Sequence, residues 1–114
     1  MKPDADLQLD LRLNTPSARS QLLEQWRLLM NERLPSMAKA HGWPISQNHC
    51  FMRVCLDTSF GVPWHDVVKR PASRHMTDDQ LRKALMVAEQ IVETPSLLVQ
   101  LNHSSILRRK RSQV

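Results

Sequence analysis

Glycine and aromatic residues are scarce in this chain of 114 residues. It contains two glycines, two phenylalanines, three tryptophans and no tyrosine. Tight turns in β-rich folds and loops that cradle phosphates both depend on glycine. The composition therefore argues against a sheet-rich protein and against a glycine-rich nucleotide-binding loop.

Long apolar runs and a secretion signal are also missing. No apolar run approaches the roughly 18 residues that a membrane-spanning helix needs. The first ten residues, MKPDADLQLD, lack the apolar core of a signal peptide. Two cysteines without such a signal indicate reduced thiols. We therefore expect a cytoplasmic protein with no membrane association.

Helix signals dominate most of the chain. Thr15 and Pro16 form a start signal, and Pro35 is expected to end or bend the helix that follows. Ser46 is expected to cap a central helix that ends at Gly61. Apolar residues recur at helical spacing within both segments. The pattern predicts a mainly α fold, a compact bundle of about five helices.

The two ends of the chain are less regular. Residues 6–13 alternate leucine with polar residues, which predicts a short strand or an extended N-terminal arm. A capping box at 77–80 opens the most amphipathic helix. A second Thr-Pro start signal, at 94–95, predicts a last helix over 96–107. Residues 97–101 also fit a strand. We expect an arm over 1–14, one helical domain over 15–107 and a basic tail over 108–114.

The stretch SQNHCFMRVCLDTSFGVPW (46–64) carries a polar stripe on an otherwise apolar helix. Cys50, Arg53 and Asp57 share one face, with His49 beside them. A thiol near a histidine, an arginine and a carboxylate is typical of nucleophilic catalysis. Adjacent helical residues point roughly 100° apart, however, so His49 is badly placed to activate Cys50. We favour a structural stripe that anchors a neighbouring segment, with Arg53 and Asp57 as an intrahelical pair.

Metal and cofactor sites are not expected. Cys50 and Cys55 lie about 140° apart on one helix, and no C-x-x-C motif is present. The fingerprints of nucleotide-binding and metal-dependent enzymes are absent as well. Trp43 and Trp64, each beside a proline, are interpreted as walls of the core, with a stacking platform as the alternative.

Positive charge concentrates at the C-terminal end. Four consecutive basic residues at 108–111 supply four of the five net positive charges, and no acidic residue follows Glu93. A nearly neutral body with a basic tip indicates local contact with phosphate groups or an acidic partner. We predict a non-enzymatic accessory or regulatory protein that contacts DNA or RNA. The predicted contact residues are Arg108, Arg109, Lys110, Arg111, His103, Lys69, Arg70 and Arg74.

Two other functions fit the same sequence. A protein-binding adaptor or inhibitor, including a homodimer, would use the leucine edge of 7–13 or the surface at Trp43 and Trp64. A thiol-dependent enzyme would use the stripe of the central helix, although we assign no catalytic residue there. Its candidates are His49, Cys50, Arg53 and Asp57.

Several blocks resemble a small bacterial family of uncharacterised proteins, some of whose members are labelled acetyltransferase-related. The blocks are NHCFMRVCLD (48–57), Gly61, Trp64, Pro71-Ala72 and TDDQL (77–81), and the resemblance spans about residues 20–110. That label implies a pyrophosphate-binding loop between a strand and a helix, a context in which neither glycine of this chain lies. The resemblance therefore implies only that the 48–81 block is a family signature, and it assigns acetyl-CoA binding to no residue.

Overall fold

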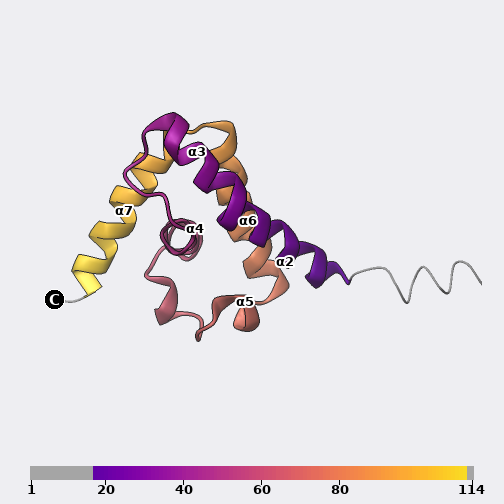
Figure 1. Cartoon of the computed structure of the whole chain (residues 1–114). Helices are drawn as coiled ribbons and strands as arrows, with labels where there is room; N and C mark the ends of the chain where they lie inside the picture. The colour runs from indigo at the N-terminus through magenta and orange to yellow at the C-terminus, as the bar shows by residue number, and fades with distance from the viewer. Residues whose placement is uncertain (1–16, 113–114) are drawn as a thin grey trace, which may run out of the picture.

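Two helical limbs meet at one end of the molecule, and a central helix runs between them. The computed structural model describes residues 17–112, and Figure 1 shows the central helix α4 (Asn48–Phe60) end-on between the limbs. One limb combines α2 (Ala18–Leu28), η1 (Leu29–Arg33) and α3 (Leu34–His41) with the adjacent α6 (Asp78–Glu93). The other limb is α7 (Leu97–Ser112).

Two short elements, η2 (Trp64–Asp66) and α5 (Ala72–His75), lie on the connection from α4 to α6 and close the open end of the molecule (Figure 1). No strand occurs within residues 17–112. The predicted compact, mainly α bundle of about five helices is confirmed. The N-terminal arm or strand falls outside the described residues.

The first limb continues through Pro35, which was expected to end or bend the helix. In a regular helix the ring of Pro35 would clash with the carbonyl four residues earlier. Here the chain widens into the π-helical turn η1 just before Pro35, and Leu34 N–H donates to the Leu29 carbonyl, five residues back. A wider turn relieves such a clash and lets the helix continue. The limb ends at Gly42, whose φ of 62° forms a left-handed C-cap.

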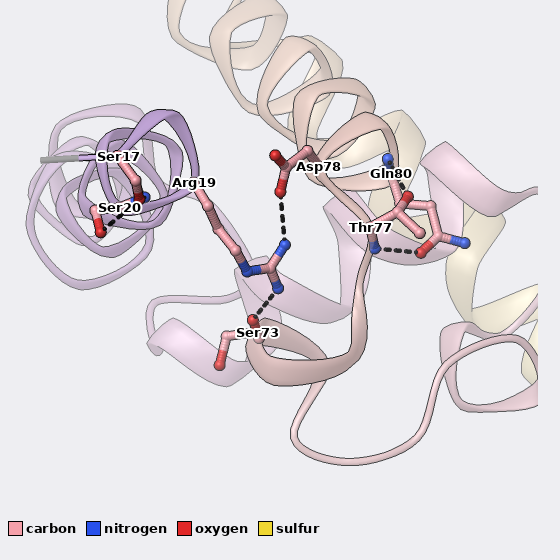
Figure 2. Close-up of polar contacts among 7 residues, drawn as sticks. All are labelled: Ser17, Arg19, Ser20, Ser73, Thr77, Asp78 and Gln80. Atoms are coloured by element: carbon pink, nitrogen blue, oxygen red, sulfur yellow. Dashed lines mark hydrogen bonds and ion pairs between the residues drawn. The ribbon is translucent and has the colours of Figure 1, made fainter.

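Helix starts agree only in part with the sequence signals. The Ser17 side chain caps α2 by accepting from Ser20 N–H at 3.0 Å (Figure 2), so the cap lies two residues after the predicted Thr15. The prediction of Ser46 as the cap of α4 is wrong, because Gln47 precedes the helix and makes no side-chain capping bond. Gly61 ends α4 as expected, with a φ of 77°.

The capping box of α6 is confirmed. Gln80 N–H donates to the Thr77 hydroxyl at 3.1 Å, and Thr77 N–H donates to Gln80 Oε1 at 2.9 Å (Figure 2). Beside this cap, the guanidinium of Arg19 on α2 reaches Asp78 at 2.8 Å and the Ser73 carbonyl at 2.9 Å. These partly exposed contacts add little free energy but fix where α2 begins relative to α5 and α6.

The core forms where α4 meets the first limb. Phe51, Val54 and Leu56 of α4 are fully buried, as expected for a central helix that is apolar on most sides. The buried residues of α6 recur at helical spacing and include Ala84 and Ala88, which are small enough to let neighbouring helices approach closely. The amphipathic pattern predicted for α6 is therefore confirmed.

The last limb differs from its prediction in extent. Residues 97–101 are helical, so the strand alternative is wrong, and α7 continues to Ser112 instead of ending near 107. The basic residues 108–111 therefore lie on a helix. The indole N–H of Trp43 donates to the Pro95 carbonyl at 3.0 Å and fixes the turn between α6 and α7. Within residues 17–112, no helix has the length and apolar character to cross a membrane.

The capping box gives a first test of this fold. Replacing Thr77 by alanine leaves the Gln80 N–H without its acceptor, and such losses cost about 1 kcal/mol of the free energy of unfolding. We expect T77A to lower that free energy by about this amount in urea unfolding. T94A, at the other end of α6, removes an exposed hydroxyl that makes no hydrogen bond to any residue of 17–112, and it serves as the control. Equal stability of T77A and T94A would contradict the capping role.

Candidate functional site

The carboxylate of Asp57 is fully buried between α4, α7 and the start of η2. Its Oδ2 accepts hydrogen bonds from the Ser105 hydroxyl at 2.7 Å and from Arg109 Nε at 2.9 Å. Its Oδ1 accepts from Trp64 N–H at 2.8 Å and from Arg109 Nη2 at 3.3 Å. A buried charge is costly unless it is paired and hydrogen-bonded. Each oxygen here has two donors, so the cost of burial is offset.

A second arginine extends the network along α4. Arg53 Nη1 donates to the Ser105 hydroxyl at 2.8 Å, and Arg53 Nη2 donates to Asn102 Oδ1 at 2.7 Å. The Ser105 hydroxyl accepts from Arg53 and donates to Asp57, so both its acceptor and its donor are used. With Leu98 and Arg109, the buried Asn102 and Ser105 form the face of α7 that lies against α4.

The predicted intrahelical pair between Arg53 and Asp57 is wrong. Each side chain instead bonds to α7, because Asp57 is buried and α7 presents a guanidinium and a hydroxyl directly to it. The broader interpretation, a polar stripe that anchors a neighbouring segment, is confirmed for these two residues. Cys50, the third member of the predicted stripe, takes no part in the anchor.

The thiol residues are not assembled into a catalytic group. His49 is exposed, Cys50 is half-buried, and no hydrogen bond among residues 17–112 joins their side chains. Burial raises the pKa of the Cys55 thiol well above its usual range, which disfavours the thiolate. In the same part of the chain, no three His, Cys, Asp or Glu side chains gather as a metal site would require.

The predicted nucleic-acid residues divide into free and engaged cations. Lys110 and Arg111 are exposed at the end of α7, and Arg108 is half-buried with a buried Nη1 that lacks a hydrogen-bond partner among the described residues. Arg109 is paired with the buried carboxylate of Asp57, so its charge is already compensated within the protein, and its assignment as a phosphate ligand stays a prediction. His103 is exposed on the outer side of α7.

The second predicted basic group lies on the connection between α4 and α6. Lys69, Arg70 and Arg74 are all exposed there. The guanidinium of Arg70 sits 5.7 Å from the centroid of the Trp64 ring, a distance typical of a cation–π contact. Trp64 is half-buried, so the pair lies at the surface.

Asp57 links Arg70 of the second group, through Trp64, to the basic end of α7. Its Oδ1 accepts from the Trp64 backbone and its Oδ2 from Arg109, so η2 and the C-terminal part of α7 converge on a single carboxylate. Arg74 follows Ser73, whose carbonyl contacts Arg19 on α2, and so lies toward the first limb. We call Arg70, Arg108, Lys110 and Arg111 the basic edge. Asp66 on η2, four residues before Arg70, is exposed and is the one acidic residue of the connection between α4 and α6.

Sequence reasoning missed the α7 side of the anchor. Asn102, Ser105 and Arg109 follow Leu98 at spacings of four, three and four, so a helix extended past 107 would have placed all four on one face. Because α4 and α7 each carry a polar stripe, the two stripes together could have predicted that these helices pack against each other. The backbone donor of Trp64 leaves no comparable signal in the sequence.

Comparisons of the chain with protein-family models, with curated proteins and with solved structures gave no match. The resemblance to an acetyltransferase-related bacterial family therefore stays a prediction. The site has to be interpreted from its own geometry.

The Asp57 anchor predicts a large difference between two arginines of one helix. R109A leaves the buried Asp57 carboxylate with two donors and no directly bonded counter-charge, a change that typically costs about 3 kcal/mol. R111A removes an exposed guanidinium and should change stability by less than about 0.5 kcal/mol. Urea unfolding of both variants measures the difference. Similar small effects for both would contradict the anchor.

The two thiols are expected to differ in reactivity. Cys55 is buried and its pKa is raised, so it should resist iodoacetamide at neutral pH in the folded protein, whereas the half-buried Cys50 can be reached by the reagent. We expect one modified cysteine by mass spectrometry, and none in C50S. Labelling of both thiols in urea is the control for reagent activity. Rapid labelling of Cys55 in the native protein would contradict its enclosure.

Proposed function

We propose that this protein is a small non-enzymatic accessory or regulatory protein that binds nucleic acid through its basic edge. The observation that carries the proposal is the convergence of cations from two segments at one end of the molecule, beside a helix that holds no acidic residue. Local positive potential of this kind, with Asp66 as the one exposed carboxylate of the neighbouring connection, favours phosphate groups over neutral partners.

Three of the four cations of the basic edge are presented by a helix, and Arg70 lies on the connection between η2 and α5. Arg108, Lys110 and Arg111 lie on the last turns of α7, and the Asp57 anchor holds this part of the helix against α4. A phosphate chain would therefore meet a surface whose backbone is already fixed, which lowers the entropy lost on binding. Four cations support a moderate affinity that falls with salt and depends little on base sequence.

A protein partner is the second candidate function. It is favoured by one observation, the exposure of Val99, Ile106 and Leu107 on the outer face of α7. Binding through these side chains would be largely insensitive to salt, because apolar burial drives it. A homodimer formed in this way would show a mass that rises with concentration in light scattering.

Neutral replacement of two exposed cations tests the nucleic-acid proposal. K110A/R111A removes two charges without touching the Asp57 anchor, so the fold should persist. We expect weaker binding of a labelled oligonucleotide in fluorescence anisotropy. The slope of log affinity against log salt should fall by about 1.4 for a single strand.

R82A/K83A is the matched control, since it removes two exposed charges from α6 on the other limb. It should bind like the parent protein. Truncation of 108–114 is a poorer test because it also removes Arg109 and with it the counter-charge of buried Asp57. Equal binding by K110A/R111A and R82A/K83A would overturn the proposal.

A further inference from the structure

The outer face of α7 is a continuous exposed stripe that no other described element covers. One row of exposed side chains on this face has spacings of seven and four residues. It consists of Val99, Ile106 and Lys110. A parallel row of exposed side chains runs beside them, at spacings of three, four and four. That row consists of Gln100, His103, Leu107 and Arg111.

A hollow lies at the N-terminal end of this stripe. It has a volume of about 420 Å³, which falls in the range of small-molecule sites. Its lining includes His41 and Trp43, whose rings stack with centroids 5.7 Å apart. Val99 and Gln100 of α7 complete the wall, so the hollow opens onto the same face that carries the cations further along.

The three features of the stripe follow one another along the helix. An aromatic hollow at one end is followed by apolar side chains and His103, and then by Lys110 and Arg111. Eleven residues separate Gln100 from Arg111, a rise of about 17 Å along a helix. Aromatic surface beside a track of cations is the combination that binds single-stranded nucleic acid, because unpaired bases stack while phosphates contact the cations.

We propose that a single strand of DNA or RNA lies along the outer face of α7, with one base in the hollow beside His41 and Trp43. Its phosphates contact Lys110 and Arg111 at the other end. This inference rests on the proposed function and adds the class of nucleic acid. Bases within a duplex are stacked on one another and cannot enter the hollow, so the strand must be unpaired at that point.

The amide of Gln100 and the imidazole of His41 add polar groups at the mouth of the hollow. Both side chains are exposed, and neither makes a hydrogen bond within residues 17–112. The Trp43 ring is itself buried, with His41 stacked on it and its indole N–H bonded to the Pro95 carbonyl. The exposed ring of His41 is therefore the stacking surface that the hollow offers. Base contact there should be tolerant of sequence, since every base can stack.

The test compares single-stranded and duplex oligonucleotides of equal length by fluorescence anisotropy. We expect the parent protein to prefer an unstructured oligo-thymidine or oligo-uridine strand over a duplex. H41A/Q100A should weaken single-strand binding about fivefold or more, because a stacked base is lost. Its duplex binding and its salt slope should be unchanged, since no cation is removed.

H49A/Q90A is the matched control. It also replaces one exposed histidine and one exposed glutamine, on α4 and α6, outside the stripe. It should bind both oligonucleotides like the parent. Thermal melting followed by circular dichroism checks that both double variants remain folded.

Each other outcome identifies which proposal fails. Equal affinity for strand and duplex, sensitive to K110A/R111A but not to H41A/Q100A, would overturn the single-strand inference and leave the proposed function standing. No binding to either oligonucleotide would overturn both. A salt-insensitive rise in mass with concentration would assign the outer face of α7 to a second copy of the chain.

Discussion

Asp57 carries a buried negative charge, and the donors that surround it come from two other segments of the chain. Trp64 supplies a backbone N–H, Ser105 a hydroxyl and Arg109 a guanidinium. An ionised carboxylate without such partners would cost several kcal/mol in this position, so carboxylate and donors must assemble together. Apolar packing tolerates small shifts of one helix on another, whereas hydrogen bonds of this length do not. The position of α7, and of the cations on it, therefore depends on this one carboxylate.

The other limb is held by a different kind of interaction. There α6 packs through buried apolar residues, and the polar contact between Arg19 and Asp78 lies partly in solvent, where an ion pair contributes little. On the α7 side, Leu98 is the one fully buried apolar residue of the helix among those described, and Asn102 and Ser105 take up the next turns. The molecule thus combines an apolar limb with a limb whose docking is specified by hydrogen bonds. Geometry around α7 is consequently more sensitive to single polar substitutions than geometry around α6.

Local signals in the sequence predicted part of the local structure, and they did not predict which segments contact one another in the fold. The capping box at Thr77 and the left-handed glycines 42 and 61 were predictable because each depends on a few neighbouring residues. The continuation of the helix through Pro35 could not be predicted, because a π-helical turn has no simple signature in the sequence. In sequence, four consecutive basic residues look equivalent. Their positions around the helix axis differ: Arg109 lies on the same face as the buried Leu98 and turns inward, while Lys110 and Arg111 face solvent.

The basic residues at the end of α7 also have an explanation that involves no nucleic acid, namely the partial negative charge at a helix C-terminus. Cations near a helix C-terminus offset the partial negative charge of its free carbonyl groups, by roughly 0.3–1 kcal/mol each at the surface. Arg109 already lies in this region, although Asp57 neutralises it. Arg108, Lys110 and Arg111 then add three charges within one turn, where they repel one another and no acidic residue of α7 compensates them. One cation would satisfy the helix end. Binding of a phosphate-bearing partner would relieve the repulsion among the remaining cations, which supports the proposed function.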